Sequence, residues 1–330
     1  MPKVSLDQIE HYALRTLIEA SATPANAAPV ARSIRRAEAD NMRPLGLGYL
    51  PIYLSHLGTG KVDGKAIPAV RQRAAAVVHV DAANGFAHPA IEAGFPALIS
   101  AARACGTATM TVTRSYSAGA LGHPAEDLAD HGLVAWAVTN SPPNIAPWGG
   151  TRPLFGTSPM AFAVPRQGHP PLVIDQATSV VTKVALVAKA KAGETLPAGW
   201  ALDAQGHLTT DAQAALAGSL APIGGAKGAA LALMIDILAA GLTGANFSKD
   251  ASPYARPEGP PPGVGQFFAA FDPNAFDSGF STRIETLYEA MLSQDGVRLP
   301  GDRRLSARDR IAHDGVEVDH ELFEIIGQLE

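Results

Sequence analysis

Between residues 74 and 141 the chain alternates strand-like and helical segments, in the order strand, helix, strand, helix, strand. The strand-like segments are AAAVVHVDA, TATMTVTRS and LVAWAVTNS, whose small and β-branched residues suit buried strands. HPAIEAGFPALISAARACG has helical spacing and ends at Gly106, a residue that favours a helix C-terminus. AEDLADHG predicts a shorter helix that ends at Gly132. This alternation predicts an α/β domain with parallel strand pairings.

The segments on either side differ in character. The N-terminal region is helical, with Ser5 as an N-cap, Gln8 completing a capping box, and an apolar face that follows. That face consists of Ile9, Ala13, Leu14 and Leu17. MAFAVP and PLVIDQAT predict further strands, residues 191–218 a surface excursion built of turns, and residues 247–265 a long ordered loop rich in proline. The run GAALALMIDILAAGLTGA contains Asp236 and further glycines, which predicts a buried helix rather than a membrane span.

Composition narrows the classes of function. The chain has 330 residues, of which 47% are hydrophobic, and a formal net charge of -5. No strongly basic face is expected, so nucleic acid is not a predicted partner. The single cysteine, Cys105, allows no intrachain disulfide and fits a reducing cytoplasm; its apolar surroundings predict a small buried residue. The N-terminus lacks the pattern of a signal peptide, and no membrane attachment is expected.

The common chemical motifs are missing from the sequence. No G-x-G-x-x-G follows the first strand, and GTGKVDGK lacks the spacing of a phosphate-binding P-loop. The sequence has no H-E-x-x-H or C-x-x-C, so no metal site is predicted, and no G-x-S-x-G of a serine hydrolase. What remains is a set of glycine-rich turns at strand ends: SYSAGALGH, APWGGTRPLFGTSP, IDQATS and IGGAKGAAL. Such turns expose backbone N–H groups and let a ligand approach closely.

Lys227 stands in GGAKG, just before a long apolar helix. A lysine beside a helix N-terminus is mismatched with the helix dipole, and a bound phosphate would relieve the mismatch. A solvated surface lysine explains the same pattern equally well, so residue pattern alone leaves both interpretations open.

The segments taken together resemble the malate/L-lactate dehydrogenase family, which is unrelated to the Rossmann-fold lactate and malate dehydrogenases. Residues 132–165, GLVAWAVTNSPPNIAPWGGTRPLFGTSPMAFAVP, are similar to the family pattern GxxGxxxTNxxPxxAPxGGxxxxxGTNPxAFAxP. IDQATSVV, LPAGWALDAQGHLTTDAQAALAG, IGGAKGAALALMIDILAAGLTGA, VGQFFAAFDP and VRLPGDRR also match in order. The resemblance covers essentially the whole chain. The family includes delta-1-piperideine-2-carboxylate/delta-1-pyrroline-2-carboxylate reductases and ureidoglycolate dehydrogenases, and most members reduce 2-oxo acids to 2-hydroxy acids.

The resemblance implies a fold and an assembly. We expect an NAD(P)-binding domain over residues 75–265 with a mixed sheet unlike a Rossmann domain. We expect a helical substrate and dimerisation domain from residues 1–74 and 266–330, and a homodimer whose active site lies between the domains and draws on the partner subunit.

The resemblance also implies a cofactor site for NADP or NAD. The positions that surround the cofactor are Ala118, Gly119, Ala120, Leu121, Asp175, Gln176, Ala177, Lys227, Gly301, Asp302 and Arg303. Lys227 and Arg303 offer cations for a phosphate, which favours NADPH over NADH. Thr157 of FGTSP corresponds to a position that contacts substrate in related enzymes.

The family's proton relay is not present in this sequence. The family pattern is Ser-His-Gly, two residues, then Arg; here the stretch reads Pro44, Leu45, Gly46 and, in place of the arginine, Tyr49. The third relay position falls near Ala185. Where the family has His-His-Phe, this chain has Tyr116, Ser117 and Ala118.

The absence of the relay residues favours the reduction of an imine over the reduction of a ketone. Reducing a ketone needs a proton for the developing alkoxide, and losing a general acid typically costs about 10²–10⁴-fold in rate. A cyclic imine can arrive already protonated, so its reduction needs cofactor, orientation and a carboxylate anchor more than an acid. We therefore expect an NAD(P)H-dependent reductase of delta-1-pyrroline-2-carboxylate or delta-1-piperideine-2-carboxylate. Tyr116 and Ser117 are the catalytic candidates, and Tyr49 and Thr157 are candidates for substrate binding; ordinary packing or loop polarity also explains the hydroxyl residues.

Two alternatives remain open. In the first alternative, the chain is a 2-oxo acid reductase whose acid has moved to another residue, such as Tyr116 or His123. His123 precedes Pro124 at a helix start, where a surface position is expected. In the second alternative, the chain is a catalytically inactive dinucleotide-binding sensor or a structural subunit, which has lost the proton relay while keeping the glycine turns.

Overall fold

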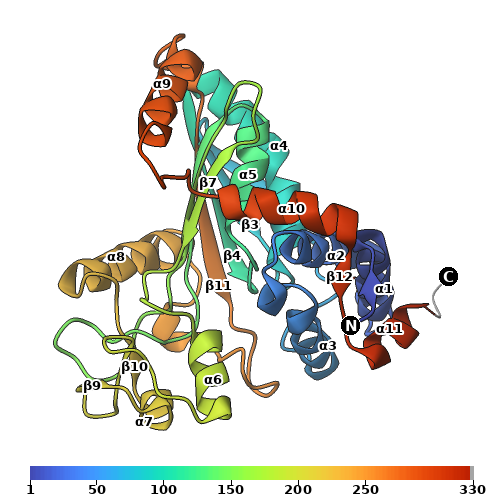
Figure 1. The fold of residues 1–330 in the computed structure, drawn as a ribbon. Helices are drawn as coiled ribbons and strands as arrows, with labels where there is room; N and C mark the ends of the chain where they lie inside the picture. Colours follow the sequence, from blue (N-terminus) through green and yellow to red (C-terminus); the bar gives the residue numbers. More distant parts are fainter. Residues whose placement is uncertain (328–330) are drawn as a thin grey trace.

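A seven-stranded mixed sheet forms the centre of the molecule, and the computed structural model describes the chain over residues 1–327 (Figure 1). The strands are β2 (Ala69–Ala74), β3 (Val77–Asp81), β4 (Thr107–Ser115), β5 (Val134–Thr139), β6 (Met160–Val164), β7 (Leu172–Gln176) and β11 (Val264–Phe271). Their order in the sheet is β2-β3-β4-β11-β5-β6-β7. The predicted α/β class and mixed sheet are therefore confirmed.

The strand β11 occupies the middle of this sheet, although it comes from the C-terminal part of the chain. Its Phe268 lies opposite Met110 of β4 and Ala137 of β5. Only β3 and β4 pair in parallel; the other neighbours in this sheet are antiparallel. The prediction of parallel pairing was thus right for the first two strands and wrong for the third, because β11 separates β5 from β4. The expected domain boundary at residue 266 falls inside β11, and the division of the chain into two domains stays a prediction. The last three residues of the second range lie outside the described residues.

Helices cover both faces of the sheet. α4 (Ala87–Cys105) and α5 (Gly122–Asp130) pack on one face, and α8 (Ala226–Asp236) with its π-helical extension η3 (Ile237–Gly241) packs on the other. The side chains of β11 alternate between them: the Phe268 ring meets Phe95 of α4 at 5.6 Å between centroids, whereas Phe267 faces the side of Ile235. Burial of both faces explains why this strand is apolar apart from Gln266.

The helix α8 is not buried all round, contrary to the prediction. Leu233 and Met234 of α8 are 46% and 53% exposed, and Ile237 at the start of η3 is 49% exposed. One face of the helix packs on the sheet through Ile235 and Ala239, and the opposite face is open in the single chain. No helix within residues 1–327 is long and apolar enough to cross a membrane.

The two ends of the chain meet in a helical unit beside the sheet (Figure 1). Its helices are α1 (Leu6–Glu19), α2 (Pro24–Ala39), α3 (Leu50–Thr59), α10 (Asp302–Asp314) and α11 (His320–Gly327), and β1 (Lys3–Val4) pairs with β12 (Val316–Glu317). The predicted capping box is confirmed, since the Ser5 N–H donates to Gln8 Oε1 at 2.9 Å and the Gln8 N–H to Ser5 Oγ at 3.1 Å. The predicted C-cap is confirmed too, with Gly106 at φ 78° after α4.

A small lobe lies below the sheet, built largely from the segment predicted to be a surface excursion of turns (Figure 1). It contains α6 (Lys183–Ala192), β8 (Ala201–Leu202), β9 (Leu208–Thr209), α7 (Ala212–Ala217) and β10 (Ser219–Leu220). The three strands form their own sheet, and Leu186, Ala201 and Leu220 pack with Ile145 and Phe155 in a separate core. The prediction was wrong because strands of two residues carry no readable periodicity.

The remaining elements lie at the edges. α9 (Phe280–Leu292) places Tyr288 against Leu172 beside the β6–β7 edge, and Cys105 is the last residue of α4. The cysteine was predicted to be buried, but it is exposed because the end of the helix turns it away from the sheet. Short 3-10 turns η4 (Ser248–Asp250) and η5 (Pro273–Ala275) flank the proline-rich loop and β11.

Candidate functional site

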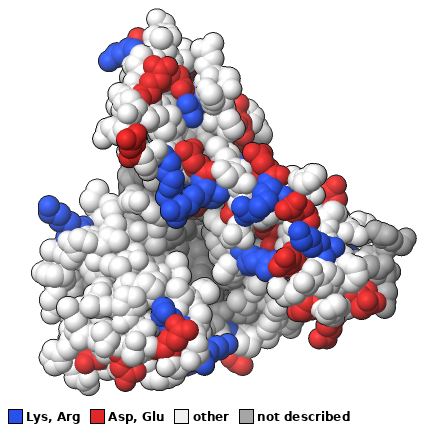
Figure 2. All heavy atoms as spheres, in the orientation of Figure 1, with Lys and Arg blue, Asp and Glu red and all other residues white. Residues whose placement is uncertain are grey.

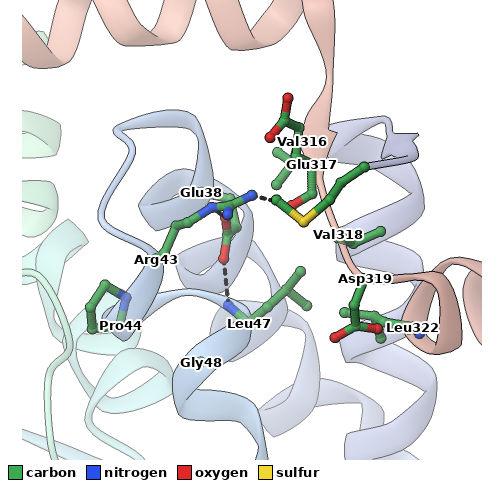
Figure 3. A pocket seen from close by; sticks show the side chains of 11 residues that line it. Glu38, Arg43, Pro44, Leu47, Gly48, Val316, Glu317, Val318, Asp319 and Leu322 are labelled. Atoms are coloured by element: carbon green, nitrogen blue, oxygen red, sulfur yellow. Dashed lines mark hydrogen bonds and ion pairs between the residues drawn. The ribbon is translucent and has the colours of Figure 1, made fainter. Parts of the chain in front are cut away.

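The turn that replaces the family's Ser-His pair connects α2 to α3 through two 3-10 turns, η1 (Arg43–Leu45) and η2 (Leu47–Tyr49). A buried carboxylate, Glu38, lies beneath it and accepts from the Leu47 N–H at 2.7 Å (Figure 3). Burial raises the pKa of this carboxyl, against the hydrogen bond from Leu47. A Cβ on Gly46 would lie 2.3 Å from Glu38 Oε1, so any larger residue at this position would displace the Glu38 side chain. Glu38 therefore has a structural role in shaping the turn.

Pro44 lines a cavity of about 470 Å³ between this turn and the C-terminal segment (Figure 3). The wall opposite is largely apolar, with Val316, Val318 and Leu322. Arg43 leaves the turn toward β12 and donates to the Glu317 carbonyl. The side chains of Pro44 and Leu45 carry no proton that could be transferred, so this part of the family's relay has no equivalent at the same position.

Tyr49, Tyr116 and Ser117, three of the predicted site residues, come together on the other side of the helical unit. The Tyr49 hydroxyl hydrogen-bonds to the hydroxyls of Ser117 and Tyr116. Its ring stacks edge-on against Tyr53 at 4.8 Å between centroids. Burial raises the pKa of Tyr49 to about 12, so it stays protonated at neutral pH.

Tyr116 follows β4 and is 1% exposed. The Gln266 Nε2–H group of β11 holds its backbone by donating to the Tyr116 carbonyl at 3.2 Å. Burial, and then its tyrosine neighbours, raise the pKa of Tyr116 well above the usual range. Its hydroxyl also hydrogen-bonds to Nδ1 of His56, a buried residue of α3.

His56 and Tyr254 were missed by sequence reasoning. The Tyr254 ring lies 5.2 Å from that of Tyr116, between centroids, in a loop far along the chain. His56 left a signal, because Tyr49, Tyr53 and His56 follow the i, i+4, i+7 spacing of one helix face. No local signal marks Tyr254.

The loop after Tyr116 holds the predicted cofactor residues Ala118, Gly119, Ala120 and Leu121. Gly119 has φ +63°, a backbone conformation that favours glycine, and its N–H donates to Ser117 Oγ at 3.3 Å. The loop leads into α5, where the Gly122 N–H donates to Asp175 Oδ2 at 2.7 Å. Burial raises the pKa of Asp175, against this hydrogen bond. The loop and the end of β7, far apart in sequence, therefore lie side by side.

The start of α10 joins the same surface. Gly301, at φ +92°, precedes the helix, and Asp302 Oδ2 accepts from the Leu299 N–H at 2.8 Å. Arg304 donates to the Val173 carbonyl at 3.0 Å and lies 3.9 Å from Asp175 Oδ2. Figure 2 shows Lys and Arg side chains gathered near the start of this helix, beside a hollow in the middle of the face. The residues predicted from VRLPGDRR thus adjoin those predicted from IDQATS.

Backbone hydrogen bonds connect the turn after β7 to the remaining predicted residues, Thr157 and Lys227. The Thr157 carbonyl accepts from the Thr178 N–H at 2.9 Å, and the Thr178 carbonyl accepts from the Ile223 N–H at 2.8 Å. Ile223 begins the turn that leads into α8, whose first residues include the exposed Lys227. Gln176, the last residue of β7, is exposed, and Ala177, which follows it, is half-buried. Ala185, the third relay position of the family, lies in the first turn of α6 and has no acidic group.

His123 is buried, contrary to the prediction of a surface position. Its Nε2 lies 3.0 Å from Asp40 Oδ2. Arg308 of α10 donates to the same Asp40 carboxylate and, at 2.5 and 2.7 Å, to the Glu126 carboxylate. Burial opposes ionisation of Asp40, but the hydrogen bonds from His123 and Arg308 outweigh it and hold the pKa well below the usual range. This network joins α2, α5 and α10 behind the site, which makes His123 a structural residue.

The predicted residues present groups suited to a dinucleotide. Lys227 and Arg303 are exposed cations, and neither has an ion-pair partner among the described side chains. The backbone around Gly119 and Gly301 offers close approach without side-chain obstruction. Over residues 1–327, no three His, Cys, Asp or Glu side chains are placed to hold a metal ion. The chemistry that fits is anion binding beside a set of protonated hydroxyls.

Known proteins resemble this chain along nearly its whole length. The family model described as malate/L-lactate dehydrogenase matches residues 4–326. The chain is 47% identical over 306 residues to a (2R)-3-sulfolactate dehydrogenase (NADP(+)) of Chromohalobacter salexigens, covering 92% of this chain and 91% of that protein. It is 39% identical over 325 residues to a Delta(1)-pyrroline-2-carboxylate reductase of Ancylobacter novellus, covering 97% and 95%. The solved structure of delta1-piperideine-2-carboxylate reductase from Pseudomonas syringae pvar. tomato is similar with a TM-score of 0.94 and 38% identity, covering 100% of each chain.

Proposed function

The chain belongs to the malate/L-lactate dehydrogenase family and is an oxidoreductase, and on this basis we propose that it reduces a small cyclic 2-imino acid with NADPH or NADH. The proposed substrates are delta-1-pyrroline-2-carboxylate and delta-1-piperideine-2-carboxylate, on which the similar reductases are named as acting. The observation that carries the proposal is the residue set Pro44, Leu45 and Ala185, which leaves the family's proton-relay positions without an acid or base. An imine that arrives protonated needs none there.

The proposed cofactor is NADP or NAD, with NADPH preferred. When bound, the nicotinamide supplies the hydride. The residues proposed to hold the cofactor are Ala118, Gly119, Ala120, Leu121, Asp175, Gln176, Ala177, Lys227, Gly301, Asp302 and Arg303. Among them, Lys227 and Arg303 provide charge for phosphate, and the backbone of the loop 118–121 allows close contact. Tyr116 and Ser117 orient the substrate from one side, and Tyr49 and Thr157 bind it.

NADPH oxidation against a small substrate panel tests the function. The panel contains the two cyclic imines, pyruvate and the 2-oxo acid that corresponds to 3-sulfolactate. We expect both imines to be reduced, with a rate that declines as the pH rises past the imine's own pKa, because the protonated imine accepts hydride. Efficient reduction of a 2-oxo acid with both imines untouched would reject the proposal.

A second candidate is reduction of a 2-oxo acid. Two observations favour it: the 47% identity to a sulfolactate dehydrogenase, and the Tyr116–His56 contact, which places a transferable proton near the candidate site. The same panel separates the two candidates.

Replacing Lys227 with alanine is expected to raise the Kd for NADPH by roughly tenfold, because one charged hydrogen bond to phosphate contributes about 1.5–3 kcal/mol and the side chain is exposed. Fluorescence titration of the cofactor measures this change. Lys249→Ala, which removes an exposed lysine paired with Asp250, is the matched control and should leave the Kd unchanged. If Lys227→Ala binds NADPH and NADH as tightly as the wild type does, Lys227 does not bind the cofactor phosphate.

We further propose that the protein is a homodimer in which each active site draws on both subunits. The face of α8 that is turned away from the central sheet lies in the proposed interface. Leu233, Met234, Ile237, Leu242 and Phe247 are all at least 42% exposed and form an apolar face that a lone subunit would leave in water. Each substitution on this face occurs twice in a symmetric dimer.

Ile237→Glu is therefore expected to raise the dimer Kd by about 100-fold, because a charge would be buried without a partner. Light scattering coupled to size exclusion should then show the mass falling toward the 34.1 kDa of one chain. Leu287→Glu changes an equally exposed leucine on α9 and should leave the mass at that of the dimer. A wild-type protein that is monomeric at micromolar concentration would rule out this interface.

A further inference from the structure

The site has a hydrogen-bonded row of groups that begins at the cofactor loop and ends inside the helical unit. Ser117 lies at the start of the loop 117–122 and hydrogen-bonds to the Tyr49 hydroxyl; the Tyr116 hydroxyl also hydrogen-bonds to that of Tyr49 and to His56 Nδ1. Of these four residues, only His56 changes protonation state in the neutral pH range when unperturbed. The row thus joins a titrating group, which is 2% exposed, to the hydroxyls proposed to face the substrate.

We propose that His56 supplies and takes up the proton of the reaction through Tyr116, whose hydroxyl contacts the reacting nitrogen or oxygen of the substrate. The inference rests on the proposed function and deepens it, because it names the group that replaces the absent Ser-His-Asp relay. Tyr116 is the catalytic residue in this scheme, and His56 is a positioning residue that acts through it.

The surroundings of His56 fix its orientation. Its ring packs against that of Tyr116 at 5.6 Å between centroids and 84° between planes, and a second hydrogen bond runs to the Arg256 backbone. The imidazole therefore bridges Tyr116 on one side and a carbonyl of the loop 253–258 on the other. A histidine held at both nitrogens keeps one ring orientation and one direction of proton transfer.

The proton transfer balances in either direction. In reduction of a 2-oxo acid, the carbonyl carbon gains a hydride, and the electron pair of the C=O bond moves to the oxygen, which takes the proton of Tyr116 Oη. An iminium nitrogen already carries its proton and becomes the amine on hydride addition without this transfer. The Tyr116 oxygen takes the Nδ1 proton of the His56 imidazolium, and the imidazole regains a proton from solvent. The substrate is reduced and the nicotinamide oxidised. In oxidation, the neutral imidazole accepts the proton through the same hydroxyl.

Several groups facing His56 set the pH at which this transfer operates. Burial lowers the pKa of His56, the Lys61 ammonium lowers it further, and the hydrogen bond to Arg256 opposes both. The Tyr116 ring packs against that of His56, and the rings of Tyr53, on the same helix as His56, and Tyr254, in the facing loop, pack against Tyr116. Glu258 lies beside Lys61. The rate of reduction through the imidazolium should therefore decline as the pH rises through the pKa of His56, which lies below the usual histidine value. The rate of oxidation should rise over the same pH range.

His56→Asn tests the inference, because asparagine can still hydrogen-bond to Tyr116 but cannot titrate. We expect kcat for 2-oxo acid reduction to fall by about 10²–10⁴-fold with KM little changed, and imine reduction to fall by less than about tenfold, since the iminium brings its own proton. The pH limb assigned to His56 should vanish. His131→Asn, at an exposed position after α5, is the control and should change none of these quantities. Equal losses for both substrate classes, or a retained pH limb, would overturn the inference.

A second measurement does not depend on turnover. ¹⁵N-histidine NMR of the unliganded protein should show one imidazole whose signal is missing in His56→Asn and whose titration midpoint shifts in Tyr116→Phe. A midpoint that is the same with and without the Tyr116 hydroxyl would overturn the coupling. If the wild type reduces neither substrate class, the proposed function fails by itself, while this titration still decides whether the two residues are coupled.

Discussion

Replacing Arg308 with methionine is expected to lower the free energy of unfolding by about 3–5 kcal/mol, the usual cost of breaking a buried ion pair by removing one partner. The guanidinium donates to Asp40 and Glu126, whose side chains are 0% and 6% exposed. Methionine keeps the apolar stem of the side chain but leaves both carboxylates without their main partner. Because Arg308 connects α10 to both α2 and α5, the substitution should also loosen the start of α10, where Gly301 and Arg303 are proposed to hold the cofactor.

Urea unfolding followed by circular dichroism measures the loss. Arg310→Met, on the exposed face of the same helix, is the matched control and should change stability by less than about 0.5 kcal/mol. Loss of less than about 1 kcal/mol in Arg308→Met would mean that His123 and Arg36 can compensate for the missing guanidinium.

The difference between wild type and Arg308→Met should depend on pH. The pKa values of Asp40 and Glu126 are held below their usual values, since hydrogen bonds and nearby cations outweigh burial. Depressed carboxyl pKa values contribute stability that is present above the unfolded-state values, about 4, and is lost as the pH falls through the folded-state values. In the variant, the same two carboxylates are buried without their cation, so protonating them in acid stabilises the folded state. The stability gap should therefore be widest near neutral pH and narrow in acid.

Replacing Lys61 with methionine is expected to lower the free energy of unfolding by roughly 2–4 kcal/mol. Lys61 is 0% exposed, and its ammonium donates to the carbonyls of Pro253, Arg256 and Glu258 at 2.6, 2.6 and 3.1 Å. Three carbonyls would lose a charged donor at once, and the proline-rich loop has few other ties to α3. Because this loop places Tyr254 against Tyr116, activity should fall together with stability.

Hydrogen–deuterium exchange localises the effect. In Lys61→Met, peptides from residues 247–263 should exchange faster, while peptides from the central sheet keep their protection until global unfolding. Lys65→Met removes an exposed lysine four residues away and should leave exchange in the loop unchanged. Uniformly faster exchange across the whole chain would indicate global destabilisation instead of a local role in fixing the loop.

Local features of the structure could be predicted because neighbouring residues decide them. The capping box of Ser5 and Gln8, the left-handed Gly106 after α4, and the strands over residues 77–81, 107–115 and 134–139 each follow from side chains within a few positions. The predicted site residues Tyr49, Tyr116 and Ser117 also come together, but it was the family resemblance, not their spacing, that placed them in one site. Their chemical roles stay a prediction.

Features that depend on distant partners could not be predicted in the same way. Cys105 ends an apolar run, yet the last turn of α4 presents it to solvent; His123 stands beside a proline at a helix start, yet Asp40 and Arg308 enclose it. The apolar α8 looked like a helix buried on all sides, whereas the sheet covers only one of its faces. In each case burial depends on which distant segment packs alongside, and local composition does not encode that.

By itself, the sequence determined the alternation of strands and helices and the glycine turns that leave backbone free for a ligand; the resemblance to the family implied that residues 44, 45 and 185 lack the acid and base found there in its other members. Tertiary structure alone decided that β11 enters the sheet between β4 and β5, and that His56 lies behind Tyr116. The physical reason is range: propensity and capping act over one or two helical turns, whereas a strand pairing or a buried hydrogen bond between residues 56 and 116 forms only when the whole core closes around it.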